Sequence, residues 1–280
     1  MKRIVFFHAG LLCLVSFGVL ATGNQPSVFT SDPSSQPVLQ LEPYQDNYML
    51  PVYFTEEPAQ QYYAPQNPNG GKTVGRTNLQ FQLSVKFGLF SNLLTDNDDV
   101  YVAYTQRSNW QAYAKSAYFR DTQYQPELFW VFRPETKIGD WTVDSYRFGM
   151  EHQSNGKGGF YERSWNRAYA DITLKNSSFC FDVKPWVRLH FGGKDYNPDI
   201  MDYMGYGKVS ATYTIDRHQF KLMLRNQAES GFSKGFEQLS WNFPIVSGLH
   251  GYMLLQSGYG AAISDYNHYD NAIGVGVSFF

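Results

Sequence analysis

Apolar and polar side chains alternate with a period of two through much of this 280-residue chain, most clearly over residues 78–90. Successive side chains of a β-strand point to opposite faces, so this stretch forms a strand with one apolar and one polar face. A run of about ten such residues is typical of a strand that crosses a membrane in a β-barrel. The apolar face comprises Leu79, Phe81, Leu83, Val85, Phe87 and Leu89, and the polar face comprises Asn78, Gln80, Gln82, Ser84 and Lys86.

Similar patterning marks about twelve segments, an even number as expected for a single-chain bacterial barrel. After the first 22 residues, no apolar run is long enough to form a membrane-spanning helix. The aromatic content of 18% suits the aromatic girdles of a membrane barrel. The predicted strands cover residues 44–54, 78–90, 100–110, 126–134, 142–154, 162–174, 181–191, 205–215, 218–228, 235–243, 250–260 and 271–280.

These patterns predict an all-β fold, a transmembrane antiparallel β-barrel of about 12 strands. Closure gives every strand a hydrogen-bonding neighbour, which lipid cannot supply. With an even strand number both termini lie on the periplasmic side, and the longer loops face outward from the cell. Those loops are expected at residues 55–76, 111–124, 155–161, 192–204, 229–234 and 261–269.

The N-terminal region has a different composition from the barrel. Residues 1–21 have the charged start, Lys2 and Arg3, and the apolar run of a secretory signal peptide. Residues 22–43 are rich in Ser, Pro, Gln and Thr, which predicts a disordered periplasmic arm. Residues 44–280 are then expected to form the transmembrane barrel.

Charge and cysteine content exclude two further features. Without Lys2 and Arg3, 21 basic residues face 25 acidic ones, a net charge of about −4, so no basic excess indicates a nucleic acid partner. Cys13 lies inside the predicted signal peptide, which leaves Cys180 alone in the mature chain. No internal disulfide can form, and Cys180 is expected to be a small packing residue.

Some polar residues are expected to have structural roles only. The acidic residues Asp96, Asp98 and Asp99 are interpreted as a solvated turn rather than a cation site. His190 falls on the polar face of its segment, which predicts a position in the barrel lumen. Pro244 is expected to form a turn between two strands.

Three polar residues gather at one end of two neighbouring strands. In the segments 142–154 and 162–174, charged residues occupy one face, whereas His152, Ser154 and Asn166 end the more apolar opposite face. A hairpin centred near residue 159 places His152 directly across from Asn166, within cross-strand contact distance. The hairpin therefore predicts that an imidazole, a hydroxyl and a carboxamide lie together on the outer wall of the barrel.

A serine beside a histidine that faces an asparagine matches a nucleophile, a general base and an orienting group. Either His152 or Ser154 alone would more readily be interpreted as a polar strand end in the head-group zone. All three together on a surface that faces lipid favour catalysis, because polar groups there are costly without a function. Asn166 would orient His152 without placing a negative charge near lipid.

The chain resembles the outer-membrane phospholipase A family. The similarity is dense over roughly residues 78–170, and elsewhere only the barrel patterning continues. The matching motifs are His152-Gln153-Ser154-Asn155-Gly156, Arg163-Ser164-Trp165-Asn166-Arg167, Tyr104-Thr105-Gln106, Phe119-Arg120-Asp121-Thr122 and Tyr124-Gln125-Pro126-Glu127-Leu128-Phe129.

The resemblance implies a calcium-dependent phospholipase of the outer membrane that hydrolyses acyl esters of phospholipids and lysophospholipids. It implies an oxyanion site at the Gly156 amide, although Gly156 could also be only a turn glycine. It further implies calcium ligands at the Lys157 backbone carbonyl, at Glu162 and at Ser116 of the partner subunit. Glu162 replaces a serine of the family, and a carboxylate is a good ligand for this hard cation. Glu162 could also be only an exposed loop residue that pairs with Lys157 or Arg163.

Active groups on the outer wall also favour a dimer. A second barrel packed against the first would complete a cleft for acyl chains, and contact through apolar side chains inside a bilayer makes this homodimer reversible. The surface available for it comprises Leu79, Phe81, Leu83, Val85 and Phe87 together with Phe148 and Met150.

Two other functions fit a barrel. One alternative is a passive channel of the porin class, although lumen charges can plug a narrow barrel by pairing with each other. The charges expected in the lumen are Lys86, Glu151, Arg163, Arg167, Asp171 and Arg188. A structural or adhesion barrel is a third possibility, but no motif supports it.

Overall fold

The computed structural model describes residues 41–246 and 248–279. The predicted signal peptide, residues 1–21, and most of the predicted arm lie outside the described residues. The last residues of that arm, Leu41–Pro43, form a short strand, β1, which pairs with the polypeptide at Val85–Phe87. The end of the arm is therefore attached to the barrel through backbone pairing.

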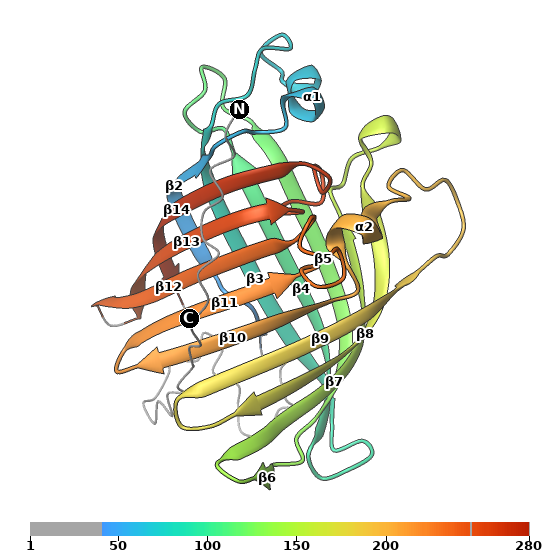
Figure 1. Ribbon diagram of the computed structural model, residues 1–280, viewed down its shortest axis with the longest axis vertical. Helices are drawn as coiled ribbons and strands as arrows, with labels where there is room; N and C mark the ends of the chain where they lie inside the picture. The colour runs from blue at the N-terminus through green and yellow to red at the C-terminus, as the bar shows by residue number, and fades with distance from the viewer. Residues whose placement is uncertain (1–40, 247, 280) are drawn as a thin grey trace, which may run out of the picture.

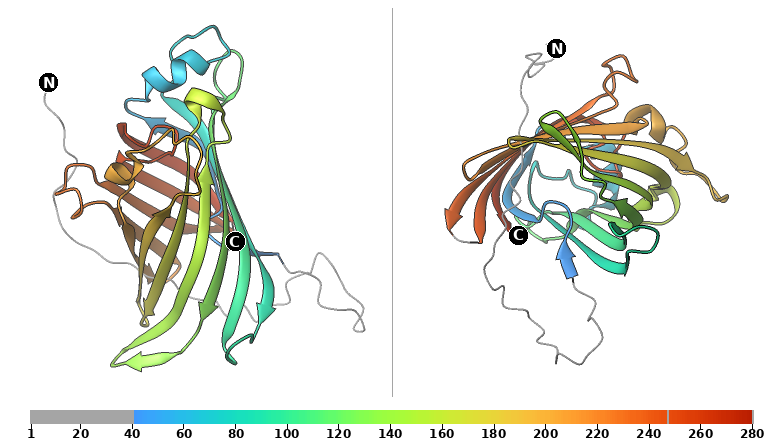
Figure 2. Two further views of the ribbon diagram at one scale, coloured as in Figure 1. Left: turned by 90° about the vertical axis from the view of Figure 1, so that its right-hand side faces the viewer. Right: turned by 90° about the horizontal axis from the view of Figure 1, so that it is seen from below.

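Twelve antiparallel strands close into one barrel, because the last strand pairs with the first long one (Figures 1 and 2). Each remaining strand pairs with its neighbours in chain order, as in an up-and-down barrel. The predicted fold class is confirmed. The strands are β2 (Tyr48–Thr55), β3 (Thr77–Ser91), β4 (Asp98–Trp110), β5 (Phe119–Phe132), β7 (Trp141–Ser154), β8 (Ser164–Lys175), β9 (Phe179–Leu189), β10 (Gly207–Ile215), β11 (His218–Arg225), β12 (Phe236–Val246), β13 (Leu249–Tyr259) and β14 (Tyr269–Phe279).

The alternation in the sequence becomes the difference between the inside and the outside of the barrel. On β3, Asn78 and Ser84 are fully buried in the interior, whereas Leu83 is exposed on the outer wall. On β9, Lys184 is buried and Val187 is exposed in the same way. Apolar side chains thus face lipid and polar side chains fill the barrel, the arrangement of a membrane barrel.

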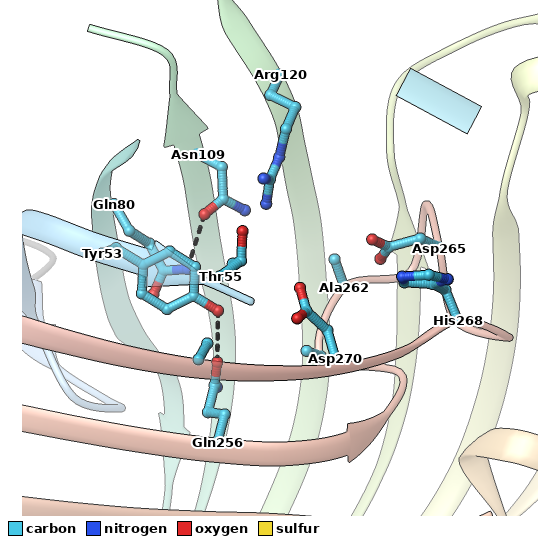
Figure 3. A pocket seen from close by; sticks show the side chains of 12 residues that line it. Tyr53, Thr55, Gln80, Asn109, Arg120, Gln256, Ala262, Asp265, His268 and Asp270 are labelled. Carbon is cyan, nitrogen blue, oxygen red and sulfur yellow. Dashed lines mark hydrogen bonds between the residues drawn. The ribbon is translucent and has the colours of Figure 1, made fainter. Parts of the chain in front are cut away.

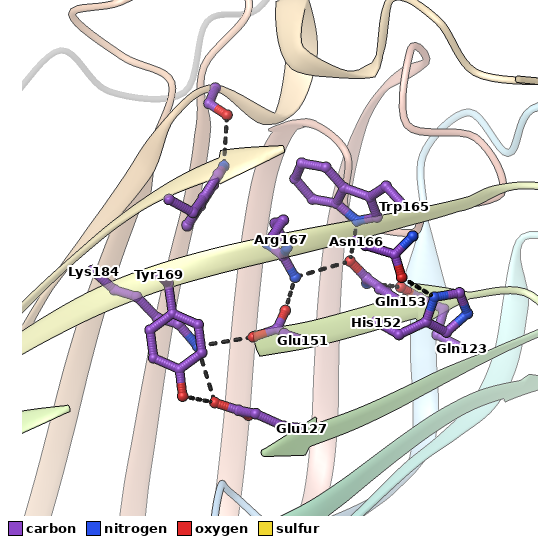
Figure 4. A network of polar contacts seen from close by, with 12 residues as sticks. Gln123, Glu127, Glu151, His152, Gln153, Trp165, Asn166, Arg167, Tyr169 and Lys184 are labelled. Carbon is purple, nitrogen blue, oxygen red and sulfur yellow. Dashed lines mark hydrogen bonds and ion pairs between the residues drawn. The ribbon is translucent and has the colours of Figure 1, made fainter. Parts of the chain in front are cut away.

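Buried ion pairs and hydrogen bonds cross the interior (Figure 4). Lys184 Nζ lies 2.8 Å from a carboxylate oxygen of Glu151 and 3.4 Å from one of Glu127. Arg167 forms an ion pair with Glu151, and the Tyr169 hydroxyl donates to Glu127. Each charge in this network therefore has a partner of opposite sign, as burial requires.

A second pair lies beside this network, between Arg147 and Asp171 at 3.0 Å. The expectation that lumen charges pair with each other is confirmed for Glu151, Arg167 and Asp171. It is wrong for Arg163, which bonds to carbonyls of the loop after β7, and for Arg188, which pairs with Asp195 of the loop after β9. Cys180 is a buried free thiol, as predicted for a packing residue.

Several short elements were not predicted. Two loops expected to lack structure contain helices, α1 (Gln60–Tyr63) with the 3-10 turn η1 (Ala64–Gln66), and α2 (Ile200–Met204). A further 3-10 turn, η2 (Gly159–Tyr161), follows β7, and β6 (Thr136–Ile138) pairs with β7 at the opposite end of the barrel (Figure 1). None of the helices within residues 41–246 and 248–279 is long and apolar enough to cross a membrane.

The predicted start of the fourth long strand was wrong. β5 begins at Phe119 rather than near residue 126, so the loop before it is shorter than expected. The pairing shifts there: Trp110 faces Phe119, Asn109 faces Asp121, and Arg120 is the extra residue of a bulge. Arg120 and Asp121 are both buried, which interrupts the alternation by which a strand is recognised from sequence.

Three predictions for single residues were also wrong. Pro244 lies within β12, opposite His250 and next to a bulge, rather than in a turn. Asp98 is not a solvated turn residue, because its buried carboxylate accepts hydrogen bonds from the Leu94 amide and the Trp130 indole. His190 is exposed beyond the end of β9 rather than in the lumen, because the strand ends before it.

The interior network gives a prediction for stability. Glu151→Ala should lower the free energy of unfolding in detergent by about 3–5 kcal/mol, because it leaves buried Arg167 without its carboxylate and leaves Lys184 with only the more distant Glu127. Asp144 pairs with Lys175 where both side chains are about 40% exposed, so Asp144→Ala should cost less than about 1 kcal/mol. Equal losses for the two variants in denaturant titrations would contradict this assignment.

Candidate active site

The β7–β8 hairpin carries the three predicted groups. His152 pairs directly with Asn166, as the hairpin register predicted, and Ser154 pairs with Ser164. β8 begins at Ser164 rather than at residue 162, because the chain first completes the η2 turn. Two regular antiparallel strands therefore hold the imidazole and the carboxamide side by side.

A hydrogen bond of 2.8 Å joins His152 Nδ1 to Asn166 Oδ1, as Figure 4 shows. A carboxamide oxygen only accepts, so the bonded imidazole nitrogen is the one that carries hydrogen. Nε2 of the same ring is then free to accept a proton. Both side chains are half-buried, so the pair remains open to the outside of the barrel wall.

Ser154 ends β7 on the same face as His152. Its side chain is half-buried, and its neighbour on β5 is Tyr124. Among the residues that the structure describes, no hydrogen bond joins the Ser154 hydroxyl to His152. Such contacts often tighten only when substrate binds, so this geometry remains compatible with proton transfer between them.

Gly156 follows the strand end in a conformation that other residues avoid. Its φ of +65° is in the left-handed region, and a Cβ there would lie 2.6 Å from the Tyr124 ring. Both the backbone and the available space therefore require glycine at this position. Its exposure leaves the loop backbone open beside Ser154.

Asn155 fixes the base of the loop that joins the two strands. Its backbone amide donates to the Arg163 carbonyl at 3.0 Å. Its side-chain oxygen accepts from the backbone amides of Arg163 and Lys157 at 3.1 and 3.2 Å. No role for Asn155 followed from the sequence, because an asparagine beside a glycine is typical of any turn.

The residues implied as calcium ligands lie on two loops. Lys157 and Glu162 belong to the β7–β8 loop and are half-buried, whereas Ser116 is exposed on the loop before β5. Lys157 Nζ turns away to Gln66 at 2.6 Å, and Arg163 contacts the backbone carbonyls of Phe160 and Glu162. Neither the Lys157 ammonium nor the Arg163 guanidinium pairs with the Glu162 carboxylate, which fits a site for a hard cation.

No group of three or more His, Cys, Asp or Glu side chains within the described ranges could hold a metal ion. The ligand set implied by the family resemblance, one carboxylate with a backbone carbonyl and a serine hydroxyl, is not a group of that kind.

The inner side of the hairpin is attached to the barrel interior. Gln153 lies between His152 and Ser154 in the chain but points inward, where its oxygen accepts from the Trp165 indole at 2.9 Å. Its amide nitrogen donates to Gln123 of β5 at 3.0 Å. These bonds fix β7 through its inner face, while the side chains on its outer face remain accessible.

A polar pocket lies inside the barrel at the end where the β13–β14 loop lies (Figure 3). Arg120 points into it, and Asp265, His268 and Asp270 line it from the β13–β14 side. Burial raises the pKa of Asp265 to about 6, and the nearby Asp121 carboxylate adds to the increase. Asp265 thus changes charge in a pH range where an exposed aspartate is already ionised.

Comparisons with known proteins agree with this architecture. The family model described as Phospholipase A1 matches residues 27–279. Phospholipase A1 of Proteus vulgaris is 34% identical over 239 residues, which cover 85% of this chain and 80% of that protein.

Two solved structures are similar. One is the Salmonella typhi outer membrane phospholipase dimer with bound calcium, with a TM-score of 0.80, 31% identity, and coverage of 86% of this chain and 92% of that one. The other is an active-site mutant of Escherichia coli outer membrane phospholipase A in which alanine replaces an asparagine. Its TM-score is 0.79 at 29% identity, over 90% of this chain and 95% of that one.

Fold and comparisons together define an enzyme built on a β-barrel of the outer membrane. The chain belongs to the Phospholipase A1 family.

The polar pocket gives a prediction for pH dependence. Because folding raises the pKa of Asp265, its charged form disfavours the folded state, and stability is lost as the pH rises from about 4 to about 6. Asp265→Asn should therefore raise the melting temperature at pH 8 by roughly 3 °C and leave it unchanged near pH 4. Thermal scans in detergent at both pH values test this, and an equal effect at pH 4 and pH 8 would count against it.

Proposed function

We propose that this protein is a calcium-dependent phospholipase that hydrolyses carboxylic ester bonds of phospholipids and lysophospholipids. Ser154 is the nucleophile, His152 the general base and Asn166 the group that orients His152. The observation that carries the proposal is the 2.8 Å bond between His152 and Asn166, beside a serine on the outer wall of a barrel of this family. The site faces the outer leaflet, where its substrate lies.

The proposed reaction is acyl transfer to water in two stages. The Ser154 oxygen attacks the ester carbonyl carbon while His152 Nε2 takes the hydroxyl proton. The protonated imidazole then gives that proton to the leaving alcohol as the carbon–oxygen bond breaks, which leaves an acyl group on Ser154. Water, deprotonated by His152, attacks this acyl group, and the fatty acid leaves as Ser154 recovers its proton.

Asn166 has the role that aspartate has in the more common triad. It holds the imidazole in the tautomer that leaves Nε2 unprotonated, and it does so without a buried negative charge. Support comes from the relative of known structure whose active-site mutant lacks an asparagine.

The Gly156 amide is the proposed donor to the oxyanion. Its left-handed conformation and exposure leave the backbone open two residues after Ser154. Backbone amides already oriented toward a developing negative charge stabilise the transition state strongly. Calcium, when bound nearby, would supply further positive charge for the same purpose.

The proposed calcium ligands are the Lys157 carbonyl, the Glu162 carboxylate and Ser116 of the partner subunit. Oxygen atoms are the ligands that calcium prefers, and the Glu162 carboxylate forms no ion pair with Lys157 or Arg163 in the described structure. A related structure is a dimer with bound calcium, which supports both parts of this proposal.

The proposed dimer forms through apolar side chains of β3 and β7 on the outer wall and is reversible. Phe148 and Met150 are about half exposed there, as is Leu83. Contact in a bilayer gains mainly from close packing, so association responds to lipid composition and to calcium. The passive-channel alternative has less support, because buried ion pairs cross the lumen.

The nucleophile assignment is tested by substitution. Ser154→Ala should reduce fatty acid release from phospholipid micelles by more than about a thousandfold, with the barrel still folded. Ser164→Ala, directly opposite on β8, is the matched control and should keep most of the activity. His152→Ala should cost more activity than Asn166→Ala, since supplying a base matters more than orienting it.

A sulfonyl fluoride should label Ser154 covalently in the wild-type protein. Turnover like that of the wild type in Ser154→Ala would refute the assignment.

Calcium dependence is tested by titration. Crosslinked dimer and fatty acid release should rise together as calcium is added, and a chelator should reverse both. Glu162→Ala should raise the calcium concentration for half-maximal activity, roughly tenfold for the loss of one carboxylate ligand, and leave the saturated rate intact. Full activity of a monomer in chelator would exclude both calcium and the dimer from the reaction.

A further inference from the structure

The loop between β2 and β3 forms a compact cap over the outer rim of the barrel. It contains α1 and η1, which lie at the upper end of the barrel in Figure 1. Ala59, Tyr63 and Val74 pack into a small buried cluster of their own, against which Tyr62 and Tyr118 rest. The cap therefore has a defined conformation rather than that of an unstructured loop.

Tyr62 of this cap reaches the candidate catalytic loop. Its hydroxyl donates to the Tyr161 carbonyl at 2.6 Å and accepts from Asn155 Nδ2 at 2.9 Å. The Tyr62 ring packs edge to face on Tyr161 with 5.7 Å between centroids, and Arg163 lies over the ring at 5.2 Å. One side chain from the cap thus contacts the loop that follows Ser154 at its first residue, Asn155, in the η2 turn at Tyr161, and at its last residue, Arg163.

The contact is well suited to fix that loop. Asn155 Nδ2 lies within hydrogen-bonding distance of Tyr62, of the Tyr161 carbonyl at 2.9 Å and of Ser264 Oγ at 3.1 Å. The Asn155 side-chain amide has only two hydrogens for these three acceptors, so they compete for its bonds. The bond that the Tyr62 hydroxyl donates to the Tyr161 carbonyl does not depend on this competition and also holds the loop. Burial raises the pKa of Tyr62 to about 12, and the hydroxyl consequently remains a donor at neutral pH.

We propose that Tyr62 is a positioning residue for hydrolysis: its hydroxyl holds the 155–161 loop so that the Gly156 amide and the Lys157 carbonyl stay aligned with Ser154. This rests on the proposed function, in which these groups serve the oxyanion and the cation. Tyr62 touches neither substrate nor the reacting atoms. It acts through Asn155, the first residue of the loop, and Tyr161, the last residue of the η2 turn.

Two further contacts join the cap to the loops that carry the proposed calcium ligands Lys157 and Ser116. Gln66 accepts from Lys157 Nζ at 2.6 Å, and Asn69 donates to the Ser116 carbonyl at 3.3 Å. The cap therefore contacts the loop that offers Lys157 to a cation in its own subunit and the loop that offers Ser116 to the partner. Loosening the cap should weaken calcium binding as well as the chemical step.

The test is Tyr62→Phe in the full-length protein in detergent micelles with calcium. The ring packing is kept, and only the hydroxyl and its two hydrogen bonds are lost. We expect kcat to fall about tenfold at unchanged KM, since small misalignments of catalytic groups have effects of this order. Covalent labelling of Ser154 by a sulfonyl fluoride should slow in parallel, and half-maximal activity should require more calcium.

Tyr269→Phe is the matched control. Tyr269 is also a rim tyrosine, and its hydroxyl lies 3.0 Å from Ser257 Oγ while its ring packs against Tyr259. This variant removes the same chemical group away from the catalytic loop, and its kcat, labelling rate and calcium requirement should match those of the wild type. Melting temperatures of both variants should stay close to the wild-type value.

Three outcomes would overturn the inference. Tyr62→Phe could match the wild type in kcat and in Ser154 labelling, or its activity could fall only in proportion to a lost folded fraction. Tyr269→Phe could also reproduce its defects. Ser154→Ala, measured in parallel, separates this failure from failure of the proposed function: an inactive Ser154→Ala beside a normal Tyr62→Phe rejects only the role of Tyr62.

Discussion

The backbone hydrogen bonds between β14 and β2 are the interaction on which the rest of this structure depends. They turn a twelve-stranded sheet into a ring, so that no strand in the wall presents unpaired amides and carbonyls to lipid. Closure also assigns every side chain of a strand to the lumen or to the membrane. The interior can then hold buried ion pairs such as Lys184 with Glu151, while the wall remains apolar.

This two-sided arrangement explains how one hairpin can have both a structural and a chemical role. On the inner side of β7, Gln153 bonds to Trp165 and Gln123, and Glu151 pairs with Arg167, which fixes the strand. On the outer side, His152 and Asn166 meet at the register set by that pairing. Rigid strands position reactive groups more accurately than loops do, and here the rigidity comes from the opposite face of the same strands.

The sequence predicted the regular part of this structure and missed the irregular part, for physical reasons. His152 and Asn166 could be paired from sequence because a period of two and a hairpin centre determine which residues face each other. The start of β5 could not, because the bulge at Arg120 breaks that period. The contact of Tyr62 with Asn155 joins residues 93 positions apart through a loop that obeys no periodicity, so no pattern in the sequence indicates it.

The bulge in β5 has a consequence for how this barrel can vary in length. Arg120 is an additional residue between Phe119, which faces outward, and Asp121, which faces inward. If that one position were absent, Phe119 and Asp121 would be consecutive and would still point to opposite sides, so the strand would become regular without exchanging its faces. At regular positions of the wall, loss of one residue would instead turn the remainder of the strand inside out. The bulge is thus a place where a chain of this family can gain or lose a residue and keep its barrel.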